Sequence, residues 1–344
     1  MAHYLTLAGR AAAIVNLDPA NEAPPYEAAL DVRDLVSLEA AMAAHGLGPN
    51  GGLLFCLDYL AANLDWLVEG LAPLAGAYVL FDLPGQTELF TMHPALPAVI
   101  AALTSGKVKM GAAGAPEGDP GQPGMAVVDT SAGAPPPRPQ PSAPPAPPAL
   151  AWRLAAVHLL DAVLCTDPAK YLAGCLDALG AMLHLELPHL NLLSKVDRLR
   201  GYGRLAFDLP FYARAGEGLE AVAAAITAGG GARGRGPAWG ARHARLTASL
   251  AECVADFALL RFLPCAIEDE GTVGRVAAAA DAAAGWVPHP GAGLPGTDRD
   301  GALPPGVGAG DEDAFLEEVA AKYGLPVADD EWEREEEEGD EDGG

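Results

Sequence analysis

Short, nearly unbroken runs of apolar residues recur along the chain and predict buried strands. Five such segments lie at residues 11–15, 77–82, 154–161, 189–197 and 259–269. The run at 77–82 shows no alternation with polar residues, as expected for a strand whose two faces are both covered in a parallel sheet. The first run leads into the loop "NLDPANE", so a strand that ends in a polar turn is expected there.

Helical spacing of apolar residues fills the intervals between these runs. The predicted helices cover residues 34–45, 53–71, 87–103, 241–260, 271–283 and 312–323. A further helix is expected to begin at Pro168, with Asp167 as its cap. Strands that alternate with helices in this way predict an α/β fold of three layers with a mostly parallel sheet.

The predicted helix at 53–71 carries a stripe of leucines that indicates a dimer. The stripe consists of Leu54, Leu57, Leu60 and Leu64. A stripe of this width exceeds what a small domain usually exposes, so we expect it to form a dimer contact. The alternative is that these leucines pack only on their own sheet.

Two segments depart from the strand and helix pattern. Twelve of the 31 prolines lie between Gly111 and Ala149, so residues 104–150 are expected to form a disordered Pro/Gly/Ala-rich insert. The tail 329–342 has eleven acidic residues and one arginine, which gives −10 of the total charge of −25. The expected organisation is a domain over residues 1–285, interrupted by the insert, followed by a flexible C-terminal region, 286–344. A soft Gly/Arg-rich loop is expected at 228–240.

The bulk composition excludes several functional classes. The acidic charge argues against a direct nucleic-acid partner. No apolar run approaches the roughly 20 residues of a membrane span, so no membrane association is expected. The five cysteines are scattered without a CxxC pair, which indicates reduced thiols and a cytoplasmic location.

Four motifs are expected at the carboxyl ends of strands, where open parallel sheets bind ligands. They are "NLDPANE", "DLPGQTE", "SKVD" and "LPCA". In the second motif, Asp82 can hold Mg²⁺ through a water, and Gly85 leaves room for a backbone N–H beside a phosphate. Gln86 and Glu88 can orient an attacking water. The simpler alternative is a Pro-Gly turn with a capping aspartate.

The motif "SKVD" favours guanine as the base. Asp197 offers two acceptors in one plane, which suits the paired N–H donors of guanine, and Lys195 can lay its stem along the ring. Ser194, Pro264 and Cys265, which lie in "SKVD" and "LPCA", are further candidate nucleotide-binding residues. Taken alone, this motif would be read as a surface turn.

The motifs together resemble the GPN-loop GTPase family, and within it the second eukaryotic paralogue. The resemblance covers residues 10–103 and 151–285 and rests on these stretches: "VNLDPANE", "GPNGG", "DLPGQTELF", "CTDPAKY", "LPHLNLLSKVD" and "YGRLAF". It implies a fold of the phosphate-loop NTPase class and a GTPase that uses GTP with Mg²⁺. It also implies a homodimer, or a heterodimer with another GPN-loop GTPase.

The resemblance also implies roles for individual residues and a cellular role for the protein. Asp18, Gln86 and Glu88 would surround the catalytic water, and Asp82 would belong to the magnesium site. Gly48, Pro49 and Asn50 would form the GPN loop, which reaches into the partner's site near the terminal phosphate. Family members act in assembly of RNA polymerase II, and also III, in the cytoplasm before nuclear import. Polymerase subunits or assembly factors are therefore expected partners, and shuttling to the nucleus is left open.

One departure from the family pattern bears on activity. Relatives carry a strand and a G-x-x-x-x-G-K-[ST] loop before "VNLDPA", and no such loop sequence occurs in these 344 residues. We therefore expect a fold without its first strand and P-loop, from a chain truncated at its N-terminus. The alternative is a non-hydrolysing pseudo-GTPase that dimerises and binds partners without nucleotide. An ATP-using relative is a third possibility, which "SKVD" disfavours.

Overall fold

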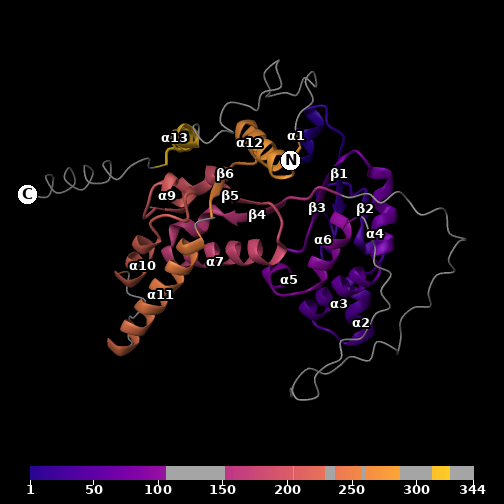
Figure 1. Ribbon diagram of the computed structural model, residues 1–344, viewed down its shortest axis with the longest axis horizontal. Helices are drawn as coiled ribbons and strands as arrows, with labels where there is room; N and C mark the ends of the chain where they lie inside the picture. The colour runs from indigo at the N-terminus through magenta and orange to yellow at the C-terminus, as the bar shows by residue number, and fades with distance from the viewer. Residues whose placement is uncertain (106–151, 204, 229–236, 258–259, 287–311, 326–344) are drawn as a thin grey trace, which may run out of the picture. The chain divides into compact units, whose positions relative to one another are not determined.

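The computed structural model describes the chain except for residues 106–151, 204, 229–236, 258–259, 287–311 and 326–344 (Figure 1). The chain forms two compact units, each with a three-stranded parallel sheet. The N-terminal unit comprises residues 10–153, and the C-terminal unit comprises residues 3–9 and 154–344. The α/β class with parallel sheets is therefore confirmed. Nearly all of the expected insert and the whole acidic tail lie outside the described residues.

In the N-terminal unit, helices surround a sheet with the strand order β2-β1-β3. Its strands are β1 (Ala12–Asn16), β2 (Leu30–Asp31) and β3 (Tyr78–Asp82). Its helices are α2 (Leu38–His45), α3 (Pro49–Ala62), α4 (Leu64–Leu71), α5 (Thr87–Thr91) and α6 (Ala95–Ser105), with 3-10 turns η1 (Val32–Asp34) and η2 (Ala72–Leu74). The two-residue strand β2 was not predicted, because it is too short to leave a periodic signal.

Two predicted helices of this unit are each broken in two. The segment predicted as 53–71 bends by 70° at Asn63, whose side-chain Nδ2 donates to the Tyr59 carbonyl at 2.7 Å. The segment predicted as 87–103 breaks before Ala95, where Pro94 has no N–H for a continuing helix. Among the described residues, no single helix is long and apolar enough to cross a membrane, and only the bent α3–α4 pair meets that criterion by length and composition.

Two of the four leucines in the predicted stripe, Leu57 and Leu60 of α3, are buried within the N-terminal unit. Each is only 1% exposed in the single chain. Helices α2 and α6 lie against α3 within the same unit and cover it. The predicted dimer contact was wrong for these two leucines, because apolar spacing shows that a helix face is buried but does not show what buries it. Leu54 of α3 and Leu64 of α4 are half-buried, and a dimer stays a prediction.

The C-terminal unit is built around a sheet with the strand order β4-β5-β6. Its strands are β4 (Ala156–Asp161), β5 (His189–Ser194) and β6 (Phe262–Cys265). Its helices are α1 (Ala2–Leu7), α7 (Pro168–Leu185), α8 (Leu199–Tyr202), α9 (Leu209–Ala213), α10 (Leu219–Ala228), α11 (Pro237–Phe257), α12 (Glu270–Ala283) and α13 (Glu312–Tyr323), with 3-10 turns η3 (Ala162–Thr166) and η4 (Val196–Arg198).

The ends of these helices test the sequence predictions. Helix α7 begins at Pro168, and the Asp167 carboxylate accepts from the backbone N–H groups of Ala169 and Lys170, which confirms the predicted cap. The helix at 312–323 is also confirmed. In contrast, α11 begins at Pro237, within the stretch predicted as a loop. Helices α8, α9 and α10 were not predicted.

Two histidines on neighbouring strands of the C-terminal unit are half-buried, and the ring nitrogens of His189 are shielded from solvent. His158 of β4 and His189 of β5 have ring centroids 6.3 Å apart. Both ring nitrogens of His189 lack a hydrogen-bond partner, and burial lowers the pKa of this side chain to about 4. Burial also lowers the pKa of His158, whose Nε2 lies 3.9 Å from the Asp177 carboxylate. The neutral form of both rings is the one that the fold stabilises.

We expect acid to destabilise the protein through these rings. His189 binds a proton near pH 6.5 when unfolded but only near pH 4 when folded, so its contribution is complete above pH 6.5 and is lost as the pH falls towards 4. Between pH 7.5 and 5, the free energy of unfolding in urea should fall by about 1–2 kcal/mol, after allowance for solvent screening. His189→Leu should lose less over this range, and an equal loss would contradict the assignment.

Candidate functional site

The strand register lines up polar residues at the carboxyl end of each sheet. In the N-terminal unit, Asn16 of β1 pairs with both Asp31 of β2 and Asp82 of β3. In the C-terminal unit, Ser194 pairs with Asp161 and Cys265. The motifs "NLDPANE", "DLPGQTE", "SKVD" and "LPCA" therefore stand at the carboxyl ends of strands, as the sequence predicted, with two motifs in each unit.

A buried amide organises the first row. Asn16 is fully buried, and its Nδ2 donates to the Asp31 carboxylate at 3.1 Å and to the Asp18 carbonyl at 3.2 Å. Its Oδ1 accepts from the Asp18 backbone N–H at 3.1 Å. The Arg33 guanidinium donates to the Asp31 carboxylate through Nε at 2.9 Å and through a terminal nitrogen at 2.6 Å. These bonds lower the pKa of the Asp31 carboxyl. The "NLDPANE" loop is thus fixed by the fold itself.

Asp82 is held by two neutral donors. Its Oδ2 accepts from the Tyr26 hydroxyl and, at 3.3 Å, from the Asn21 amide. Burial, assisted by the Asp82 carboxylate, raises the pKa of Tyr26. Neither Tyr26 nor Asn21 was singled out in the sequence. Asn21 could have been found, since it lies within "NLDPANE", but Tyr26 follows two prolines and carries no periodic signal.

A second carboxylate adds negative charge beside Asp82. Burial raises the pKa of Asp18, the Ala20 N–H that bonds to its Oδ1 at 2.8 Å lowers it, and the charge of Asp82 raises it further. The oxygen donors suit Mg²⁺, which is usually held by one or two carboxylates together with substrate phosphates. Within the described ranges, no group of three His, Cys, Asp or Glu side chains could hold a metal. Asp18 and Asp82 would therefore hold Mg²⁺ only if the phosphates of a nucleotide supplied further oxygen ligands.

At two positions in the motifs, Gly48 and Gly85, the fold itself does not require a glycine. Gly48 caps α3 with φ −76°, ahead of Pro49 and Asn50, and a Cβ added there would meet nothing within 4 Å. The same space is open at Gly85, next to the exposed Gln86. Since neither glycine avoids a clash or adopts a positive φ, their small size is available for the approach of a ligand or partner. Glu88 is likewise exposed, in the first turn of α5.

The "SKVD" turn has its own fixed geometry. Lys195 adopts a left-handed conformation with φ 61°, and its Nζ lies 2.5 Å from the Asp161 carboxylate. The Ser194 hydroxyl donates to the Leu160 carbonyl at 3.0 Å. The Asp197 side chain is 34% exposed and so remains open to a ligand. In "LPCA", on the neighbouring strand β6, Pro264 is buried and Cys265 is half-buried.

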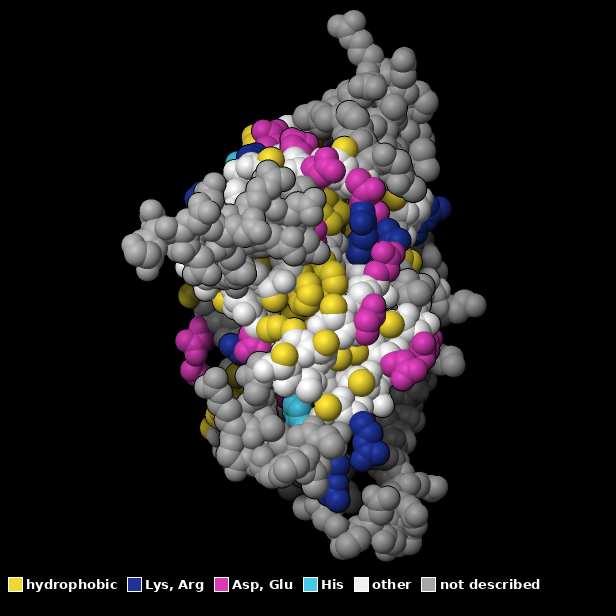
Figure 2. Space-filling model, turned by 90° about the vertical axis from the view of Figure 1, so that its left-hand side faces the viewer, with side chains coloured by type: hydrophobic (Ala, Val, Ile, Leu, Met, Phe, Trp, Pro, Cys, Tyr) yellow, Lys and Arg dark blue, Asp and Glu magenta, His cyan; other side chains and the backbone are white. Residues whose placement is uncertain are grey.

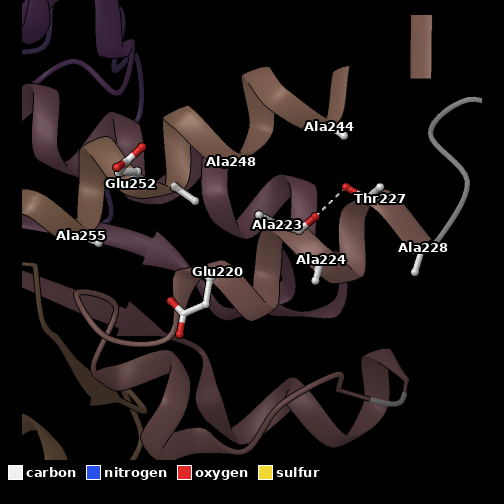
Figure 3. A pocket seen from close by; sticks show the side chains of 10 residues that line it. Glu220, Ala223, Ala224, Thr227, Ala228, Ala244, Ala248, Glu252 and Ala255 are labelled. Atoms are coloured by element: carbon white, nitrogen blue, oxygen red, sulfur yellow. Dashed lines mark hydrogen bonds between the residues drawn. The ribbon is translucent and has the colours of Figure 1, made fainter. Parts of the chain in front are cut away.

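A groove elsewhere in the C-terminal unit has different chemistry. A groove of about 770 Å³ lies between α10 and α11, lined mainly by alanines, with Glu220 and Glu252 (Figure 3). The Thr227 hydroxyl there donates to the Ala223 carbonyl at 2.9 Å. Figure 2 shows hydrophobic side chains gathered in the middle of one face of the protein, with acidic side chains beside them. This groove offers no cation for a phosphate, so the strand ends are the better nucleotide candidates.

Comparison with known proteins identifies the family. The profile of the family described as "Conserved hypothetical ATP binding protein" matches residues 1–114 and 148–286. GPN-loop GTPase 2 of Xenopus tropicalis is 39% identical over 83% of this chain and 77% of that protein. The chain belongs to the GPN-loop GTPase family. GPN-loop GTPase QQT1 of Arabidopsis thaliana is 35% identical over 83% of this chain and 79% of that protein.

A GPN-loop GTPase 3 is similar to a smaller part of this chain, and one solved structure has a weaker similarity. GPN-loop GTPase 3 of Saccharomyces cerevisiae is 37% identical over 58% of this chain and 57% of that protein. The crystal structure of a GTPase in apo form from Pyrococcus abyssi is 21% identical, with a TM-score of 0.49, and covers 80% of this chain and 87% of that one.

The buried Asn16 should be essential for the first polar row. We expect Asn16→Leu to lower the free energy of unfolding by about 1–3 kcal/mol, because it leaves the Asp31 carboxylate and the Asp18 N–H without their amide partner. Urea unfolding measures this loss. Glu27→Gln, an exposed change in the same connecting segment, is the control and should have little effect. An Asn16→Leu variant as stable as the parent would contradict the role given to the amide.

Proposed function

We propose that this protein binds and hydrolyses GTP with Mg²⁺. Family membership supports the proposal, and the observation that carries it is the alignment of the four motifs at the carboxyl ends of the two parallel sheets. Within the N-terminal unit, carboxylates and open glycines suit magnesium and phosphates. Within the C-terminal unit, "SKVD" suits a guanine base.

Each candidate residue has a separate role in the proposed hydrolysis of GTP. Asp82 would hold magnesium through a water, and the metal would neutralise phosphate charge when bound. Asp18, Gln86 and Glu88 position the attacking water, because phosphoryl transfer depends on orientation more than on covalent help from the protein. Tyr26 and Asn21 orient the Asp82 carboxylate. Gly85 admits a backbone N–H to the terminal phosphate.

The assembly and cellular role follow by family analogy. The protein acts as a homodimer, or as a heterodimer with another GPN-loop GTPase, in which Gly48, Pro49 and Asn50 reach the partner's nucleotide. The exposed helix start and the open space at Gly48 support this use of the loop. Its role is to assist assembly of RNA polymerase II and III in the cytoplasm before nuclear import, through contacts with polymerase subunits or assembly factors.

A nucleotide-free scaffold is the alternative function. The observation in its favour is that no G-x-x-x-x-G-K-[ST] sequence occurs in the 344 residues. That loop supplies the lysine and backbone N–H groups that cradle phosphates, and carboxylates cannot replace them. A scaffold of this kind would dimerise and bind partners without GTP.

Binding measurements on two versions of the protein separate these functions. The 344-residue chain should bind GTP more weakly than millimolar, because the missing charge-assisted hydrogen bonds are worth about 1.5–3 kcal/mol each. A version extended by a family-like strand and GK[ST] loop should bind GTP at micromolar concentrations and hydrolyse it. In that version, Gln86→Ala or Glu88→Ala should slow hydrolysis about 100-fold or more while sparing affinity. Tight GTP binding by the 344-residue chain would show that the phosphate site is misplaced.

Base selectivity should rest on Asp197. In the extended version, Asp197→Asn should weaken GTP binding by about 1–3 kcal/mol and improve binding of xanthosine triphosphate, whose base presents an acceptor where guanine has its amino group. Competition calorimetry with ATP, GTP and xanthosine triphosphate measures the change, with Asp208→Asn as a control that removes a carboxylate serving as a helix cap. Equal affinity of the parent for ATP and GTP would refute guanine recognition.

A further inference from the structure

The last described helix, α13, ends against the turn that follows "LPCA". The Asp269 carboxylate accepts from the Tyr323 hydroxyl at 2.9 Å and lies 2.8 Å from the Lys322 ammonium. Its side chain is only 12% exposed. Burial opposes the charge of Asp269, but these two donors and the Gly271 N–H lower its pKa. Helix α13 is therefore joined to this turn through the largely buried Asp269 carboxylate, while the Lys322 side chain that pairs with it is exposed.

The same turn connects Asp269 to the candidate base site. The second oxygen of Asp269 caps α12 through the Gly271 N–H at 3.0 Å. The Thr272 hydroxyl, one residue further, bonds with both the carbonyl and the N–H of Ala266, at 2.9 and 3.1 Å. Ala266 directly follows Cys265, which pairs in register with Ser194 of "SKVD". A continuous set of hydrogen bonds thus runs from α13 to the end of β6.

The rest of α13 is firmly seated on the C-terminal unit. Phe315, Leu316, Val319 and Ala320 are buried, and the Arg275 guanidinium lies 3.7 Å from the centroid of the Phe315 ring. Arg261 and Glu312 form an ion pair at 3.0 Å near the start of the helix. Helix α13 lies beyond residue 286, where the match to the family profile ends (Figure 1).

We propose that α13 is a positioning element for base recognition, acting through Tyr323 and Asp269. This inference rests on the proposed function and extends it to a segment outside the family match. With Tyr323 bonded to Asp269, the β6–α12 turn is held in place before a base arrives. Without that bond, the turn must be ordered at the expense of binding free energy.

Thiol labelling of the 344-residue chain tests the contact without any nucleotide. Cys253 is exposed, Cys56, Cys165 and Cys175 are buried, and Cys265 is half-buried, so in a Cys253→Ser background a maleimide reports on Cys265. Tyr323→Phe keeps the ring and removes the hydroxyl. It should speed labelling of Cys265 about 2–10-fold, which corresponds to one hydrogen bond. Glu318→Gln, an exposed change on the same helix, should leave the rate unchanged.

Nucleotide affinity in the extended version supplies the second readout. Tyr323→Phe should raise the Kd for GTP about 2–10-fold and leave kcat unchanged, because the tyrosine supports the turn at the base and takes no part in the reaction. Equal labelling of the parent and Tyr323→Phe would overturn the proposal, as would faster labelling with an unchanged Kd. Failure of the unmutated extended version to bind GTP would count against the proposed function instead, and labelling would still decide whether α13 holds the turn.

Discussion

In-register parallel pairing is the constraint on which the rest of this structure depends. Parallel strands that start together also end together, so residues far apart in the sequence meet in one row at the carboxyl edge. Asn16, Asp31 and Asp82 form such a row in the N-terminal unit. If one strand shifted by one residue against its neighbour, its polar side chain would point to the opposite face of the sheet, and the row would be lost.

The charges at the two edges are balanced in different ways. Asp31 is paired with Arg33, and Asp161 with Lys195, so these carboxylates stabilise the loops that carry them. The partners of Asp82 are instead a phenol and an amide, which order the carboxylate without neutralising it. Such an arrangement leaves the negative charge of Asp82, with the Asp18 carboxylate beside it, without a neutralising cation among the described residues, which suits the magnesium of the proposed function.

Helix α13 connects the fold to the site in a further way. Its apolar face is buried on the C-terminal unit, while its last turn contacts the loop after β6. The family profile ends before this helix, yet the helix contacts a motif that lies inside the profile. Residues outside a family match can therefore contact residues within it, because tertiary contacts do not follow the boundaries of sequence similarity.

The sequence by itself determined the α/β class, most strands, the start of α7 and the places of the four motifs, since apolar runs and capping residues act locally. It could not reveal β2 or the partners of Asp82, because two residues leave no period and Tyr26 meets Asp82 across 56 positions. It misjudged Leu57 and Leu60, whose periodicity shows burial but not the covering surface. Only the tertiary structure decided these points, because packing and long-range hydrogen bonds choose partners that local patterns do not encode.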